Sequence, residues 1–122
     1  MTYFPNLQTL AVQYTALQTD AIIVTASATQ RIVVTDVTVT VGGAVTVNQV
    51  AVVIGFGTPS TPTGTGVVFR HSGILPGQQA QRAAGGGTLG GGDFNEDLRI
   101  TSEAPTGGAL DVIVSYWIEE SI

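Results

Sequence analysis

Apolar and polar residues alternate along much of this chain, with the period of two that side chains follow in a β-strand. Residues 31–41 give the clearest example, because Thr38 and Thr40 fall on one face of the segment. The opposite face carries Val33, Val37, Val39 and Val41. Ile32 and Val34 disturb the alternation at the start. The pattern predicts a strand with one buried face.

A second strand is predicted over residues 45–56, directly after Gly42-Gly43. Two glycines between alternating segments favour a hairpin turn, because glycine adopts positive φ without steric cost. One face of this segment carries Val50, Val52, Ile54 and Phe56, and the other Val45, Val47, Ala51 and Val53. We therefore expect the strand to be covered on both sides, centrally or against a neighbouring subunit. Its interface candidates are Val50, Val52 and Ile54.

Shorter segments rich in Val, Ile and Thr complete the set of expected strands. They cover residues 21–26, 67–71, 98–101 and 110–118, and residues 7–17 fit a strand at least as well as a short helix. Loops rich in glycine, proline or polar residues are expected at 57–66, 72–81 and 83–93. The predicted fold class is all-β: an antiparallel β-sandwich or jelly roll of about seven or eight strands.

The length of 122 residues suits one domain with a substantial core. We predict a single β-sandwich domain over residues 11–122. Residues 1–10 precede the regular pattern and contain Tyr3, Phe4 and Pro5. We expect an N-terminal arm there, with Tyr3 and Phe4 as interface candidates.

The last expected strand carries the only tryptophan of the chain. Its apolar face consists of Leu110, Val112, Val114, Tyr116 and Ile118. Trp117 therefore points the other way, on the same side as Ile113. An outward tryptophan near an isoleucine is more typical of a subunit interface than of a lone sugar-binding platform. Ile113 and Trp117 complete the interface candidates.

Charged residues make up 11% of the chain, against a usual share of about 25%. The net charge is -5, and the sequence contains four arginines and no lysine. Phosphate neutralisation needs clustered Lys and Arg, so no nucleic-acid partner is expected. A surface of Thr, Ser, Gln, Asn and Gly suits burial in an assembly.

Cysteine is absent, which excludes disulfides, thiolate metal sites and a thiol nucleophile. No apolar segment approaches the roughly 20 residues that span a bilayer, so no membrane partner is expected. The first residues lack the pattern of a signal peptide, which predicts synthesis in a cytoplasm.

One glycine motif of this chain has the spacing of a nucleotide site. Gly85, Gly87 and Gly90 match the spacing of the dinucleotide fingerprint, but that motif works between a strand and a helix. Here the glycines run into Asp93 and a strand. A Walker A loop needs a lysine, which this chain lacks. We expect no cofactor.

Asp93, Asn95 and Asp97 have the oxygen spacing that opens a calcium loop, and they are the one metal candidate. An EF-hand would continue with glycine and a later acidic residue, where this chain has Leu98 and Ala104. A solvated turn that uses Asp and Asn for its geometry is the favoured alternative.

No catalytic residue is expected. His71 is the only histidine, and its neighbour Ser72 would point to the opposite face of a strand. The acidic pairs Glu96-Asp97 and Glu119-Glu120 lie in an expected turn and near the C-terminus, without aromatic platforms around them.

The Thr- and Val-rich strands and glycine-rich loops resemble small β-sandwich virion proteins of tailed bacteriophages. The resemblance covers residues 30–120 and is carried mainly by residues 73–77, the glycine loop, residues 96–101 and residues 104–108 before the last strand. It implies a capsid decoration (cement) protein or a tail fibre-knob module. It also implies a homotrimer whose strands and arms add to neighbouring subunits.

Three functions are therefore expected, in descending order. The first is a homotrimeric capsid decoration protein, made in the host cytoplasm and located in the virion, with the major capsid protein or another virion protein as partner. The second is a tail fibre or receptor-binding module that contacts host surface glycans through loops 57–66 and 83–95. The remote third is a free-standing carbohydrate-binding domain or small hydrolase. We expect the arm to dock on a neighbouring capsid subunit, and deletion of residues 1–8 tests this through capsid occupancy.

Overall fold

The computed structural model describes residues 6–61 and 66–121, which form nine β-strands. The strands are β1 (Gln8–Tyr14), β2 (Gln18–Val24), β3 (Gln30–Val41), β4 (Val50–Phe56), β5 (Val67–Ile74), β6 (Gln79–Ala83), β7 (Gly90–Gly91), β8 (Leu98–Ser102) and β9 (Leu110–Glu120). Within these described ranges, no helix is long and apolar enough to cross a membrane.

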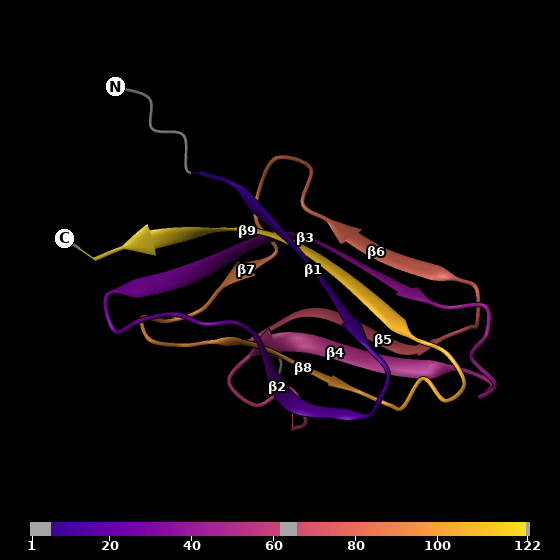
Figure 1. Cartoon of the computed structure of the whole chain (residues 1–122). Helices are drawn as coiled ribbons and strands as arrows, with labels where there is room; N and C mark the ends of the chain where they lie inside the picture. Colours follow the sequence, from indigo (N-terminus) through magenta and orange to yellow (C-terminus); the bar gives the residue numbers. More distant parts are fainter. Residues whose placement is uncertain (1–5, 62–65, 122) are drawn as a thin grey trace.

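The strands form two sheets that lie one above the other (Figure 1). Sheet A, the upper one in that view, has the order β1-β9-β3-β6, with the short β7 also paired to β3. Sheet B has the order β2-β8-β4-β5. Every pairing is antiparallel. The predicted antiparallel β-sandwich is confirmed.

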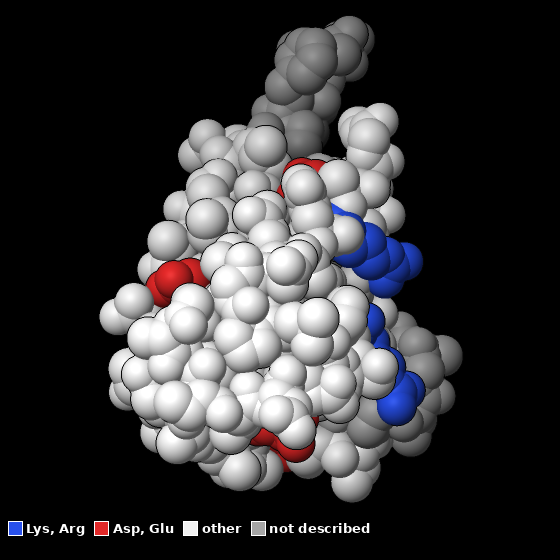
Figure 2. Space-filling model, turned by 90° about the vertical axis from the view of Figure 1, so that its right-hand side faces the viewer, with Lys and Arg blue, Asp and Glu red and all other residues white. Residues whose placement is uncertain are grey.

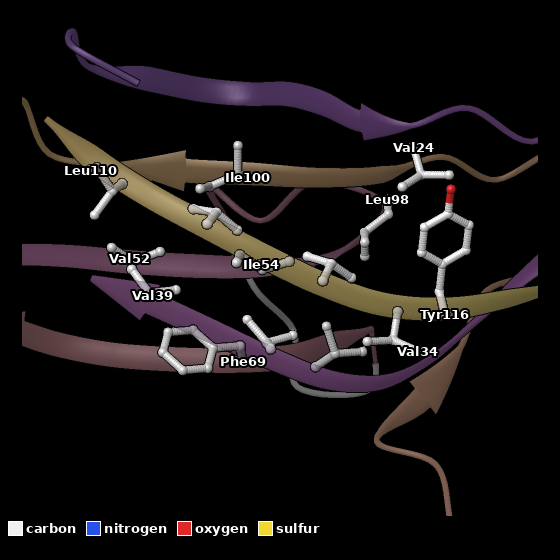
Figure 3. Close-up of a cluster of buried hydrophobic side chains, with 14 of the residues drawn as sticks. Val24, Val34, Val39, Val52, Ile54, Phe69, Leu98, Ile100, Leu110 and Tyr116 are labelled. Atoms are coloured by element: carbon white, nitrogen blue, oxygen red, sulfur yellow. The ribbon is translucent and has the colours of Figure 1, made fainter. Parts of the chain in front are cut away.

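Side chains from the inner faces of both sheets meet in one apolar core (Figure 3). β9 behaves as its alternation predicts, because its inward residues from Leu110 to Tyr116 are buried while Asp111 and Ile113 are exposed. The largest fully buried side chains are Ile32, Ile54, Leu98, Ile100 and Leu110, together with Val34, Val37, Val39, Val41, Val50, Val52 and Val68. The core therefore draws on both central strand pairs.

β3 contains a bulge that corrects the predicted face of Val33. The register of β3 with β9 shifts between Val34 and Asp36, so Thr35 is an extra residue. An extra residue exchanges the inner and outer rows of a strand. Val33 consequently pairs with Trp117 on the outer face and lies outside the core cluster.

The irregular start of the β3 pattern has the same cause. Ile32 and Val34 point inward before the bulge, and Val37 and the following alternate valines point inward after it. The Thr35 hydroxyl donates a hydrogen bond to the carbonyl of Ser115, 3.2 Å away. This bond gives the buried hydroxyl at the bulge a partner.

The hairpin predicted at Gly42-Gly43 is wrong. β3 belongs to sheet A and β4 to sheet B, so residues 42–49 form a crossover between the layers. The amide of Gly42 donates to the carbonyl of Ala109, and that of Thr46 to the carbonyl of Thr106. These bonds pair the crossover with the turn before β9, and the strand begins at Val50 instead of Val45.

The assignment of Val50, Val52 and Ile54 to a subunit interface is also corrected. All three are fully buried and belong to the core cluster of their own domain. The opposite face of β4 is carried by Ala51 and Val53, which are partly exposed. Val50, Val52 and Ile54 are therefore used in holding the two sheets together.

We expect Ile54→Ala to lower the free energy of unfolding by about 2–5 kcal/mol, because it leaves a cavity between the sheets. Ile113→Ala, on an exposed site of β9, is the matched control and should cost less than about 1 kcal/mol. Urea denaturation of the purified chain measures both values. Equal losses for the two variants would contradict the inward placement of Ile54.

Candidate interaction surfaces

The outer face of sheet A carries the two remaining interface candidates. Ile113 is 43% exposed, and Trp117 is partly exposed four residues further along β9. Ala11 of β1 pairs with Ile113, so its methyl group lies on the same outer face. The sequence prediction that Ile113 and Trp117 face away from the core is confirmed, and their use as an interface stays a prediction.

A hollow of about 360 Å³ lies beside Trp117. Its other lining residues are Leu7, Thr35, Asp36, Gly86 and Gly87. Leu7 is 56% exposed, which leaves a large apolar side chain next to the indole. The bulge at Thr35 and the glycine loop therefore contribute to an apolar depression that the sequence did not indicate.

Tyr3 and Phe4, the other interface candidates, lie outside the described residues, as do residues 62–65 of the segment expected to be a loop. The predicted N-terminal arm therefore overlaps the described structure only at its end. β1 begins at Gln8, inside the range that was assigned to the arm.

One end of the sandwich includes three loop segments without a charged residue, and exposed Glu103 borders the last of them at the start of the loop before β9. These loops are residues 42–49, 75–78 and 104–109, and we call them the uncharged end. The amide of Gly77 donates to the carbonyl of Val41, which holds the second loop against the end of β3. Figure 2 views the molecule from this side and shows a largely uncharged surface, with Lys/Arg colour on one flank and separate acidic spots.

The uncharged end is closely packed. Side-chain atoms added at Gly107 or Gly108 would meet Thr46, Val45 or the backbone of Ala44 at 3.2 Å or less. Leu75 lies at the same end and is 54% exposed. The sequence showed each loop to be uncharged, but only the fold brings the three loops together.

At another site, Asp20 of β2 fixes the loop that follows β4. Its carboxylate accepts hydrogen bonds from the Ser60 amide at 2.8 Å, from the Ser60 hydroxyl, and from the Thr101 hydroxyl at 3.2 Å. Arg99 donates to the carbonyl oxygen of Asp20 at 2.9 Å. Asp20 has a φ of 49°, in the left-handed region where Asp and Asn are among the favoured non-glycine residues.

These contacts stabilise the charged form of Asp20. The Ser60 hydroxyl and then the Ser60 amide lower the pKa of the carboxyl below its ordinary value, with smaller contributions from Thr101 and Arg99. The sequence analysis did not select Asp20, because its partners are 40 and 81 positions away.

The loop held by Asp20 borders a hollow of about 400 Å³. Its lining includes Thr58 and Thr61, the carboxylates of Asp93 and Glu96, and Phe56 as its aromatic residue. The lining combines hydroxyl, carboxylate and backbone groups. Such groups are suited to hydrogen bonding with a polar ligand.

The calcium candidates form a turn. Asn95 has a φ of 64°, and the Glu96 amide donates to the carbonyl of Asp93. The Asp97 carboxylate accepts a hydrogen bond from the Ala26 amide at 2.9 Å and pairs with Arg99 at 3.5 Å. Among the described residues, no group of three or more His, Cys, Asp or Glu side chains is arranged to hold a metal ion.

His71 and the paired carboxylates make structural contacts. The Nδ1 atom of His71 accepts a hydrogen bond from the Gly73 amide at 3.1 Å. Glu119 pairs with Arg31 at 2.9 Å, and Glu96 accepts from the Asp93 amide at 3.0 Å. Each group thus has a local partner.

Comparison with solved structures places the fold among known proteins. The chain aligns with a chain of the acidic stable capsid structure of Helicobacter pylori bacteriophage KHP30, with a TM-score of 0.56 and 12% identity. This alignment covers 95% of the present chain and 93% of the phage chain. The two proteins share the same overall sandwich.

Two looser alignments involve the capsid of Ralstonia phage GP4 and Bacillus endospore appendages that form disulfide-linked pili. Their TM-scores are 0.48 and 0.44, with 11% and 18% identity. They cover 96% of this chain in each case, and 90% and 88% of the other chain. No protein-family model matches the sequence, and no curated protein matches it.

We expect Asp20→Asn to reduce the hydrogen-exchange protection of the Ser60 amide several-fold, because the variant lacks the charge that strengthens these bonds. The pKa of Asp20 is lowered in the folded state, so its contribution is complete above the ordinary aspartate pKa and is lost as the pH falls through the lowered value. Wild-type protection should therefore fall in acid. Asp111→Asn, at an exposed carboxylate bonded to Gln13, is the control, and equal losses would refute the role of Asp20.

Proposed function

We propose that this chain is a structural protein of a tailed-phage virion that decorates the capsid surface. The observation that carries the proposal is the uncharged end, a closely packed surface of three loops that suits burial against another protein. Protein contact surfaces are depleted of charge at their centre. The chain acts through shape and buried area and has no catalytic role.

The topology supports the same assignment. With the two-residue β7 set aside, eight strands lie in two four-stranded sheets with interleaved order. We interpret this order as a jelly roll, an architecture found in viral capsid proteins and lectins. The alignment with a chain of a phage capsid over nearly the full length of both proteins agrees with this interpretation.

Three copies form the assembly in this proposal, as the sequence resemblance implies. The uncharged end contacts the shell, while the outer face of sheet A, with Ile113 and Trp117, is left for contacts between neighbouring copies. The arm with Tyr3 and Phe4 adds a further contact to a capsid subunit.

A receptor-binding module is the second candidate, and the hollow beside Thr58 and Glu96 favours it. Its volume of about 400 Å³ and its polar lining suit a sugar unit. In that role the protein would bind host cells instead of the capsid shell, so adsorption of the labelled chain to cells separates the two functions.

The decoration role predicts that the purified chain binds to particles of the encoding phage that lack it. Ala44→Glu and Asn48→Glu place a carboxylate on exposed sites of the uncharged end, and we expect each to lower occupancy about tenfold, since burying an unpaired charge is costly. Gln81→Glu, on exposed β6, is the matched control and should bind normally.

Cosedimentation with quantitative mass spectrometry measures the occupancy. Failure of the wild-type chain to bind would refute the decoration role. Normal binding of all three variants would show that another surface makes the contact.

A further inference from the structure

A strand at the edge of a sheet presents backbone N–H and C=O groups that have no neighbouring strand. Proteins usually interrupt such edges with charges, proline, short strands or bulges. In the described part of the chain, the edge strands are β1 and β6 in sheet A, with the two-residue β7 beside β6, and β2 and β5 in sheet B. They differ in how far they are interrupted.

Three of these edges are interrupted. β2 has two register shifts against β8 and contains Asp20 with its positive φ. β5 has two register shifts against β4 and contains Arg70 and His71. β6 is only five residues long and includes Arg82, whose guanidinium donates to the carbonyl of Val68 in β5 at 2.8 Å.

β1 is regular by contrast. It pairs with β9 over seven consecutive residues without a shift. Its sequence, Gln-Thr-Leu-Ala-Val-Gln-Tyr, contains no charged residue, glycine or proline. Leu10, Val12 and Tyr14 are only partly buried, so apolar surface reaches the open side of the sandwich.

We propose that β1 pairs with β1 of a second copy of this chain. The two strands run antiparallel about a two-fold axis at Ala11, and the A sheets of the two copies become one continuous sheet. Free backbone groups along both edges form the ladder, as in other cases of strand addition.

The side chains of β1 match one another in this register. Leu10 lies opposite Val12 of the second copy on the inner face, and Thr9 lies opposite Gln13 on the outer face. The Ala11 residues face each other at the axis, where a small side chain permits close approach. Gln8 lies opposite Tyr14 of the second copy, which is the one mixed pair. The Leu10–Val12 pair is apolar and the Thr9–Gln13 pair is polar.

The charge of the chain does not oppose this contact. Asp111 of β9 is bonded to Gln13 and is the acidic group beside β1. In the two-fold arrangement the two Asp111 residues are separated by three strand spacings and four residues, about 20 Å. This exceeds the Debye length of about 8 Å at physiological salt, so their repulsion is screened.

The inference goes beyond the proposed function and holds whether or not the chain decorates a capsid. A two-fold contact through β1 is separate from a three-fold contact. If both occur, trimers would be linked into even-numbered assemblies or a continuous net.

Single cysteines test the register, because the natural chain has none. Ala11→Cys brings two thiols opposite each other in an antiparallel pair, at a separation that a disulfide spans. Gln13→Cys is the matched control on the same strand and face, because its two copies lie about 14 Å apart. Under mild oxidation we expect Ala11→Cys to form covalent dimers at least tenfold faster than Gln13→Cys.

An equal mixture of Thr9→Cys and Gln13→Cys should cross-link between the two variants, since those positions face each other. The mass of the wild-type chain, measured by light scattering across a dilution series, should correspond to an even number of copies. Equal cross-linking of Ala11→Cys and Gln13→Cys, or a monomer or lone trimer at all concentrations, would overturn the proposal. Capsid binding is measured separately, so this failure is distinguishable from failure of the decoration role.

Discussion

Each long strand of the sandwich must direct the side chains of every second residue toward the other sheet. In sheet A, the register between β3 and β9 determines which residues point inward. Eleven residue pairs join these two strands at the centre of the sheet. The bulge at Thr35 keeps apolar residues inward on both sides of it, since a strand without it would turn Ile32 and Val34 outward. Burial of the two inner rows is the main stabilising contribution, and the position of every loop follows from it.

The strands that sequence analysis predicted well are those whose alternation is uninterrupted. The sequence of β9 shows one apolar face and one mixed face. The outward orientation of Ile113 and Trp117 follows directly from this alternation. The inward and outward faces of β3 could not be assigned over its whole length from the sequence. The bulge inserts one residue, and no residue pattern marks where it lies. The register with β9 determines it, and that register depends on contacts about 80 positions apart.

The errors around residues 42–56 have a different origin. Gly42-Gly43 fits a hairpin, but local turn geometry does not specify whether the next strand stays in the same sheet. The crossover bonds to Thr106 and Ala109 decide this, and they are made with a distant loop. Val50, Val52 and Ile54 were assigned to an interface because residues 45–56 carry apolar side chains on both faces. That pattern suggested that another layer or subunit covers each face of the strand. The structure satisfies that pattern with a short crossover followed by a strand that has one fully buried row.

The surfaces left after the core is formed account for the proposed role. The uncharged end and the outer face of sheet A come from segments that are distant in sequence, so composition indicated their character but not their location. The side chains of Asp97, Glu119 and His71, which could in principle bind a metal or transfer a proton, form hydrogen bonds or ion pairs with nearby groups instead.

Cryo-electron microscopy of the particle that contains the chain tests this account most directly. The account predicts density for the domain at repeated positions on the outer surface of the head, with residues 42–49 and 104–109 against the shell. Density confined to the tail, or a domain attached to the shell through sheet B with the uncharged end in solvent, would contradict it.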